Sequence, residues 1–588
     1  MSKFINIFTQ RLVILISLST LLLGCNALLG NEPTPTPIPT PTLLPPLARA
    51  VTILPDAIIV PIPIDPPSFN AYINDTGYEE LIGELVFGAL AELDPAGQYY
   101  PELALDVPTL ENGGLSQDGL TVTWQLRPGL VWSDGEPFTT RDVIFTWQSL
   151  RDSNIFAPGF DLIDSIDAPD AHTVIIHYRE FYPNYRLQFG GEGVGIFPAH
   201  HCGDTDRMLL WDCNLNPVSL GPFVLEEWQA GERLVFNANP NFWMPNRPLA
   251  QQLIFTIQAE AEIREQQLRR GEAHLDLWSE EPFLTRFEED EDVFLQETNP
   301  ARFVLRFVPN LSDFGTADTA QPHPILADKR VRQAIRHAIN IPLIIEEVFD
   351  NRAYPIHSEL TRQGCVVPEY PYNPAKANAL LWEAGWVDSD NDDVRECRGC
   401  LYAEEGTIFK FESFHYAEFG STLAQAHRRM ELMLFDVGVD IRPKPVEGFD
   451  LWGTWADEGV ETRGDYHLNL WDDGYFGIDP TDYFYNRYDP RTIPTRNDPL
   501  SGFNVMRYLN RDVVDIFDQL QSPLTDEERQ AQVCQLAQIL ANDIPDIPLL
   551  ALPDYYALHR RLQGVSGHIY DTITWNAGDW HLLPESEE

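Results

Sequence analysis

Residues 120–150 read LTVTWQLRPGLVWSDGEPFTTRDVIFTWQSL, and this stretch decides the fold. Its first part alternates apolar and polar side chains, with Val122, Trp124 and Leu126 on one face, which predicts a half-buried strand. Asp134-Gly135 predicts a tight turn. Thr139 then precedes an apolar stripe at helical spacing, as an N-cap residue does. A strand, a turn and a helix within so short a stretch indicate a mixed α/β protein.

The same mixture continues along the chain. Alternating side chains predict further strands at 302–308 and around 234–236. Capping residues followed by apolar residues at helical spacing predict helices that begin after Asp328, after Asn373 and after Thr525. These apolar faces are expected to form the core.

Composition excludes several classes of protein. The 588 residues include 89 Asp or Glu and 40 Lys or Arg, and 89 minus 40 gives the formal net charge of −49. Such an acidic chain repels phosphate backbones, so nucleic-acid binding is excluded. The hydrophobic content of 44% is too high for wholesale disorder. High net charge also favours a soluble monomer.

The first 25 residues predict export from the cytoplasm. Leu12 to Leu23 is an almost unbroken apolar run, and twelve residues at about 1.5 Å each span about 18 Å, too little for a hydrocarbon core of about 30 Å. The run is therefore expected to be a signal peptide. It ends in Leu22-Leu23-Gly24-Cys25, which resembles a bacterial lipobox, so Cys25 is predicted to carry the lipid. Residues 26–50 follow as a Pro/Thr-rich, extended tether. Together these segments predict an extracytoplasmic protein anchored to the cell membrane by lipid.

The six cysteines after Cys25 are expected to form disulfides, since the predicted location is oxidising. Cys202 and Cys213 are a plausible pair in one loop. The other four cysteines can pair in three ways. Two long-range disulfides are favoured over a zinc site, because Cys397 and Cys400 have neither a second CxxC nor a nearby His pair. These four cysteines are Cys365, Cys397, Cys400 and Cys534.

Two segments have residue types that bind metals. Asp388 to Glu396 places carboxylates at alternate positions, like the start of a calcium loop, but Asp393 occupies the position that an EF-hand gives to glycine. A polar surface loop is favoured. His200-His201 precedes a cysteine that is expected to be bridged, so nickel is not favoured there. We expect neither a metal site nor a cofactor.

Several blocks resemble one family, the bacterial extracellular solute-binding proteins family 5, which bind oligopeptides, dipeptides or nickel. The most specific block is the quoted stretch, where Arg127, Gly129, Trp132, Asp134-Gly135, Pro137 and Asp142-Val143 match the family pattern. Further blocks follow in the order of the family. They include Gly271–Asp276, Asp328–Ala334 and Asn373–Trp386.

The resemblance implies a two-lobed fold like that of the periplasmic binding proteins, type II and similar to cluster C, with an extra inserted subdomain. One lobe would be discontinuous and built from 51–75, 216–298 and 541–588. The inserted subdomain would be 76–215, and the second lobe 299–540.

The function implied by the resemblance is capture of a solute between two lobes and its delivery to an ABC transporter permease, without chemistry on the ligand. Peptide-binding members use an aspartate for the α-amino group of the ligand, in a segment like "W-x-x-D-x-x-D/E-P". The matching stretch here is Trp471 to Pro480, but its acids, Asp472 and Asp473, are displaced in register. We expect short peptides as ligands, with Asp473, or failing it Asp472, on the ammonium group and with Trp471 and Tyr475 beside it.

Alternatives stay open at this point. Asp472-Asp473-Gly474 could be a solvated turn, and any single Trp is more often buried core than ligand site. A ligand-sensing receptor or an oligosaccharide-binding protein could use the same fold. A surface glycoside hydrolase is the least favoured, because no hydrolase motif supports it.

Overall fold

The computed structural model describes residues 51–584 except 75, 192–193, 278, 280–282, 313–320, 418–419, 475–480 and 499–501, and leaves the side chains at 299–302 and 362–363 undescribed. The predicted signal peptide, Cys25 and the tether lie outside the described residues. So does Tyr475.

Residues 120–150 have the predicted local structure. Strand β4 spans Thr121–Gln125, and helix α3 spans Thr140–Asp152. Between them Gly135 has a φ of 94° and donates its N–H to Trp132 O at 2.8 Å, which closes the turn. Thr139 caps α3 through a reciprocal capping box with Asp142. The prediction of strand, turn and helix is confirmed.

The first lobe is built on a four-stranded sheet of order β1-β9-β8-β7, in which β1 and β9 are parallel and the other pairs antiparallel. The strands are β1 (Ile58–Ile62), β9 (Gln252–Ile257), β8 (Arg233–Ala238) and β7 (Phe223–Gln229). One apolar core joins this sheet to the region of β4 and α3, and it includes the fully buried Phe255 and Trp580.

Small elements complete the first lobe. Strand β6 pairs with β4 and β5, and β2 pairs with β3. Their bounds, with those of the remaining helices and strands of this side, are α2 (Tyr78–Gly83), β2 (Ala91–Leu93), β3 (Tyr99–Pro101), β5 (Ile163–Asp167), β6 (Thr173–Tyr178), α4 (Ala261–Arg269), β10 (Leu275–Asp276), α5 (Phe283–Glu288), β19 (Leu562–Gln563) and β20 (His581–Leu582).

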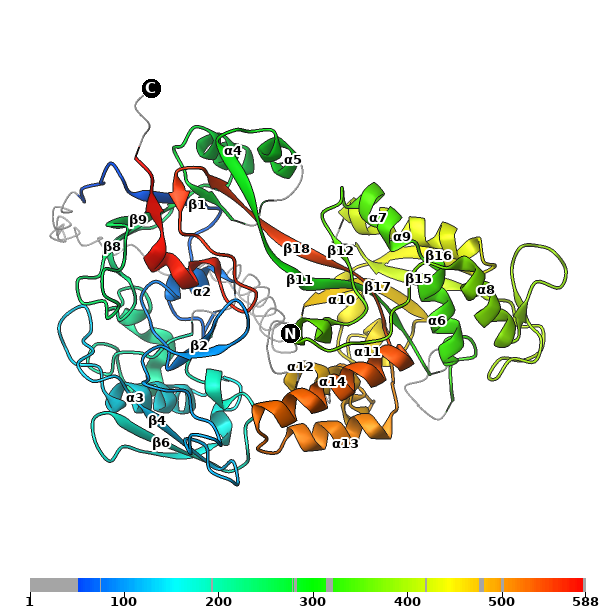
Figure 1. The fold of residues 1–588 in the computed structure, drawn as a ribbon, viewed down its shortest axis with the longest axis horizontal. Coiled ribbons are helices and arrows are strands. Elements are labelled where there is room, and N and C mark those ends of the chain that lie inside the picture. The colour runs from blue at the N-terminus through cyan, green and yellow to red at the C-terminus, as the bar shows by residue number, and fades with distance from the viewer. Residues whose placement is uncertain are drawn as a thin grey trace, which may run out of the picture.

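The second lobe is built on a larger mixed sheet. Its strands run in the order β10-β18-β11-β17-β15-β16, and β12 (Tyr354–Pro355) pairs with β18. They include β11 (Val293–Pro309), β18 (Ile547–His559), β17 (Leu468–Gly474), β15 (Lys410–Tyr416) and β16 (Asp440–Val446). The two long strands, β11 and β18, run antiparallel from one lobe into the other (Figure 1). They are the covalent connection between the lobes, as a hinge requires.

Helices cover both faces of this sheet and enclose two apolar cores. They are α6 (Lys329–Ala338), α7 (Ile341–Val348), α8 (Pro374–Glu383), α9 (Gly420–Phe435), α10 (Gly448–Trp452), α11 (Val460–Arg463), α12 (Thr481–Tyr488), α13 (Arg511–Leu520) and α14 (Asp526–Asp543); a short hairpin joins β13 (Trp386–Val387) to β14 (Glu396–Cys397). The sequence boundaries at 75/76, 215/216, 298/299 and 540/541 stay a prediction, because β11 and β18 contribute to the cores on both sides.

Three disulfides are present among the described residues. Cys202 is joined to Cys213, and Cys365 to Cys534 at a sequence separation of 169. The remaining bridge joins Cys397 to Cys400 within one turn. The expectation of two long-range bridges is therefore wrong for the CxxC pair, because the turn brings its two Cα atoms to 5.6 Å, within reach of a local disulfide.

Within the described part of the chain, none of the helices combines the length and apolar character that crossing a membrane requires.

Candidate functional site

The predicted acid pair lies in a strand. Strand β17 pairs with β11 up to its last residue, with Asp472 opposite Leu305 and Asp473 opposite Val304. Both acids are partly buried. The alternative of a solvated turn is therefore wrong, and the pair lies beside the strands that connect the lobes.

The strand pleat separates the two carboxylates. Successive residues of a strand point to opposite faces of its sheet. Asp472 therefore shares a face with Leu470 of the core, whereas Asp473 shares a face with Trp471 and, across the ladder, with Arg306. The two acids meet different surroundings although they are neighbours in sequence.

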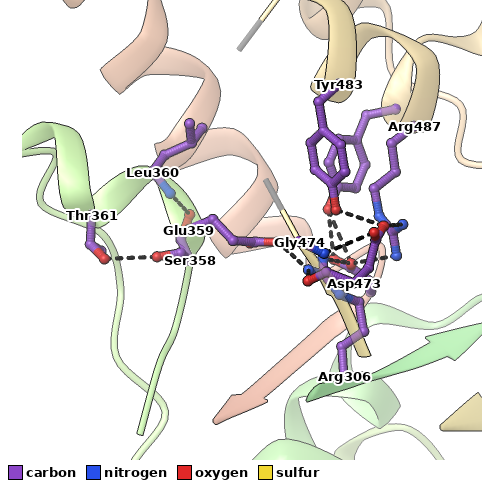
Figure 2. A network of polar contacts seen from close by, with 11 residues as sticks. Arg306, Ser358, Glu359, Leu360, Thr361, Asp473, Gly474, Tyr483 and Arg487 are labelled. Atoms are coloured by element: carbon purple, nitrogen blue, oxygen red, sulfur yellow. Dashed lines mark hydrogen bonds and ion pairs between the residues drawn. The ribbon is translucent and has the colours of Figure 1, made fainter. Parts of the chain in front are cut away.

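Asp473 already has partners within the protein. Its Oδ2 accepts hydrogen bonds from the hydroxyl of Tyr483 at 2.8 Å and from Nη1 of Arg487 at 2.9 Å, as Figure 2 shows. Its Oδ1 accepts from the N–H of Gly474 at 2.9 Å. A guanidinium and a phenol therefore satisfy the Asp473 carboxylate before any ligand arrives.

In the described part of the chain, Asp472 has no such side-chain partners. Among the residues that the structure describes, no cation forms an ion pair with its carboxylate. The pKa of Asp472 is raised to about 6, chiefly by burial and also by the nearby Asp473 charge, against the lowering effects of a backbone hydrogen bond and of Arg306. A carboxylate that is desolvated but unpaired is stabilised by any cation that comes within contact distance.

A buried ion network lies beneath the acid pair. Arg306 of β11 is fully buried and forms ion pairs with Glu359 and, at 2.9 Å, with Asp546, whose side chains are 2% and 4% exposed (Figure 2 for Arg306 and Glu359). Arg487 also approaches Asp546, at 3.4 Å, and the hydroxyl of Tyr488 donates to both oxygens of Asp546 at 3.1 and 3.0 Å.

The network is short of positive charge. Burial alone would raise the pKa of Asp546, but the two guanidiniums lower it, so this carboxylate is ionised. Arg306 and Arg487 then face the carboxylates of Glu359, Asp473 and Asp546. Two cations against three acids leave one excess negative charge, and Asp472, on the other face of β17, adds a further negative charge nearby that a cationic ligand group would neutralise.

Trp471 supports the site from below. It is 8% exposed and packs in an apolar core. Its indole N–H donates to Glu461 at 2.8 Å, and the guanidinium carbon of Arg487 lies 5.0 Å from its ring centre. Burial raises the pKa of the Glu461 carboxyl to about 7. Trp452 packs edge-on at 5.8 Å. Little of Trp471 is left for a ligand to touch.

The remaining metal-like segments are arranged as follows. The carboxylates of Asp388, Asp390 and Asp392 lie within 4.8 Å of one another on a loop, and this is the only group of three or more possible ligands of that kind in the described residues. Backbone N–H groups of the loop donate to two of them. His200 lies 2.8 Å from Asp134, and His201 contacts the carbonyl of Asn216, so these two rings bind separate partners.

Sequence reasoning missed most of the network. Arg306, Glu359, Arg487 and Asp546 are scattered along the chain, and no motif connects them. The one available indication was Arg306 itself, a charged residue inside the apolar run Phe303 to Phe307, which signals a buried partner.

Comparison with known proteins identifies the family. Residues 98–494 match the bacterial extracellular solute-binding proteins, family 5 (Middle). This span is more than half of the chain.

The chain belongs to this family. It is similar to Protein XP55 of Streptomyces lividans, with 26% identity over 341 residues that cover 56% of this chain and 57% of that protein. Di/tripeptide-binding protein 2 of Pseudomonas aeruginosa is 26% identical over 372 residues, which cover 58% and 65% of the two chains. The chain thus spans less than two thirds of the length of these relatives.

Solved structures agree on the fold. The oligopeptide-binding protein AppA of Bacillus subtilis, in complex with a nonapeptide, aligns with a TM-score of 0.59 at 19% identity over 90% of this chain and 99% of that one. NikZ of Campylobacter jejuni, in complex with Ni(L-His), aligns with a TM-score of 0.64 at 21% identity over 90% and 100%. The chain has the two-lobed α/β fold of family 5 periplasmic binding proteins, type II, as the sequence predicted.

Proposed function

We propose that this protein captures short peptides between its two lobes and delivers them to the permease of an ABC transporter, while a lipid on Cys25 anchors it to the outer face of the membrane. The family supports solute binding and transport, and the name of the Pseudomonas relative supports peptides. The family's role as transport proteins also argues against an enzyme. The solute class and the anchor are the parts that need experiment.

One observation carries the proposal: the half-buried Asp472 carboxylate, with a pKa of about 6 and no ion-pair partner among the described residues. A peptide has an α-ammonium group, which is the cation that would neutralise this acid. Asp473 is the less suitable residue, because Arg487 at 2.9 Å already neutralises it. The structure therefore favours Asp472 over Asp473, the reverse of the order that the sequence suggested.

The other predicted site residues take supporting roles in this proposal. Asp473, fixed by Arg487 and Tyr483, keeps the negative potential around the ligand amine. Trp471, on the same face of β17 as Asp473, holds Arg487 against its ring. Tyr475 follows on the same segment, where an aromatic ring could stack on a peptide side chain. A nickel complex or a heme would be a different ligand class on the same fold.

Calorimetry with a pool of short peptides and with the same pool N-acetylated tests the proposal. A charge-assisted hydrogen bond contributes about 1.5–3 kcal/mol, so acetylation of the peptides or Asp472→Asn should weaken binding about 10- to 150-fold. In Asp472→Asn, acetylation should then make little further difference.

Asp473→Asn is the matched control. It removes a neighbouring carboxylate that is already paired, so it should weaken peptide binding less than Asp472→Asn does. Equal affinity for free and acetylated peptides in the wild type would exclude the amine-binding role. Binding of oligosaccharides but not peptides would show that the ligand class is wrong.

A further inference from the structure

The two lobes touch at a second place, far along the chain from the connecting strands. Nδ2 of Asn184, in the first lobe, donates to Oδ2 of Asp482 at 2.8 Å, and Nη2 of Arg186 lies 2.8 Å from Oδ1 of Asp526. In Figure 1 helices α12 to α14 lie next to the end of the first lobe that carries β4 and β6. We call these two polar pairs the interlobe contact.

Close packing accompanies the interlobe contact. A Cβ added to Gly119 would lie 3.2 Å from Cβ of Pro523 in the other lobe and 2.5 Å from the ring of Phe181. The side chain of Pro523 therefore lies close to Gly119, with no room between them for a further side chain. Gly119 also has a φ of +71°, so both its space and its conformation favour glycine.

Arg186 is held in place by residues of its own lobe. Its guanidinium carbon lies 4.9 Å from the ring centre of Tyr99 and 5.5 Å from that of Tyr185, and Nε donates to the Tyr185 hydroxyl at 3.1 Å. All three residues belong to the first lobe. The side chain of Asp526, by contrast, is 66% exposed, and it stands on the first turn of α14 in the other lobe. The contact thus joins an exposed acid to an arginine held by its own lobe, so little entropy is lost on the arginine side when the lobes close.

Helix α12 connects this contact to the candidate ligand site. Asp482 reaches the first lobe, whereas Tyr483 and Arg487 of the same eight-residue helix bind the carboxylate of Asp473. A shift of the acid pair on ligand binding would therefore move the helix that carries half of the interlobe contact.

We propose that the interlobe contact is the element that stabilises the closed form and slows ligand release, and that α12 links it to the acid pair. The ligand part of this inference rests on the proposed function. Because the contact exists only when the lobes meet, its loss should raise the dissociation rate and leave the association rate nearly unchanged. The claim that the interlobe contact stabilises the closed form does not depend on which ligand binds.

The test uses Asp526→Arg, which replaces the attraction to Arg186 by repulsion at an exposed position. Glu527→Arg is the matched control, since the next residue on the same helical turn undergoes the same charge change and is exposed. Nitroxide labels on non-canonical residues at the exposed positions 180 and 519 report the distance between the lobes by pulsed electron resonance. Stopped-flow tryptophan fluorescence with tetra-alanine reports the rates.

We expect Asp526→Arg to lower the ratio of closed to open molecules, read from the populations of short and long label distances, about five- to tenfold. The dissociation rate of tetra-alanine should rise by a similar factor. Glu527→Arg should stay within twofold of the wild type in both measurements. In the ligand-free protein, the effects of Asp526→Arg and Asp473→Asn on this ratio should be non-additive, because α12 joins the two sites.

The outcomes are distinguishable. If tetra-alanine does not bind but the ligand-free distances still shift in Asp526→Arg, the peptide proposal fails and the closing role stands. Distances and rates that are the same in Asp526→Arg and Glu527→Arg would overturn the closing role. Additive effects of Asp526→Arg and Asp473→Asn would overturn the link through α12.

Discussion

Removal of Arg306 should expose how strongly the buried network stabilises the second lobe. The variant Arg306→Met replaces the guanidinium by a long, apolar side chain and so removes the charge. Asp546 would keep Arg487 and Tyr488 as partners. Glu359, 2% exposed, would lose the arginine with which it forms its ion pair. One uncompensated buried carboxylate is therefore the expected consequence.

The expected loss in the free energy of unfolding follows from this one unpaired carboxylate. Breaking a buried ion pair by removal of one partner costs about 3–5 kcal/mol, because the remaining charge stays desolvated. Neutralising the orphan with Glu359→Gln on top of Arg306→Met should recover about 1–3 kcal/mol of the loss. The exposed pair of Lys444 with Glu412 provides the control: Lys444→Met should cost at most about 1 kcal/mol.

The assay is urea denaturation followed by tryptophan fluorescence, with calorimetry to separate the transition of the second lobe. The two single variants and the double variant form a thermodynamic cycle. If Arg306→Met costs no more than Lys444→Met, or if Glu359→Gln gives no recovery, the network does not stabilise the lobe as argued.

Three further predictions concern other parts of the molecule. His427 is fully buried against Ser413 and His415, and its pKa is lowered by burial first and then by the neighbouring imidazole. The contribution of His427 to the free energy of unfolding should be complete above pH about 6.5 and fall as the pH drops, by up to about 1.4 kcal/mol per pH unit, because only the unfolded chain takes up the proton. Melting curves from pH 7.5 to 5 check this slope, which His427→Gln should flatten. Serine substitution of both cysteines of the Cys365–Cys534 disulfide, whose sequence separation is 169, should lower the free energy of unfolding by about 5 kcal/mol. The same substitution of the CxxC disulfide, with a separation of 3, should lower it by about 1.5 kcal/mol, and equal losses would contradict the chain-entropy account. Cys25→Ser should release the protein into the soluble fraction, and its retention on membranes would exclude the lipid anchor.

Local elements were predictable where neighbouring residues suffice to form them. The capping boxes of Thr139 and Thr525 are present because each needs only a hydroxyl and an acid three residues later. The helix after Asn373 buries Ala377 and Leu381 as its spacing indicated. The CxxC disulfide was missed because sequence spacing alone does not distinguish a bridged turn from two distant partners.

The sequence by itself determined the fold class and the family, since both rest on strands, turns and helices whose residues are adjacent along the chain. It also placed the acid pair beside Trp471. Only the tertiary structure decided how the two acids differ. Arg306, Arg487 and Asp546 come from three separate segments, and their charges meet at β17 only when β11, α12 and β18 pack together. Burial and pairing of charge depend on that packing, so Asp473, paired with Arg487, and Asp472, without an ion pair among the described residues, look alike in the sequence and differ in the folded protein.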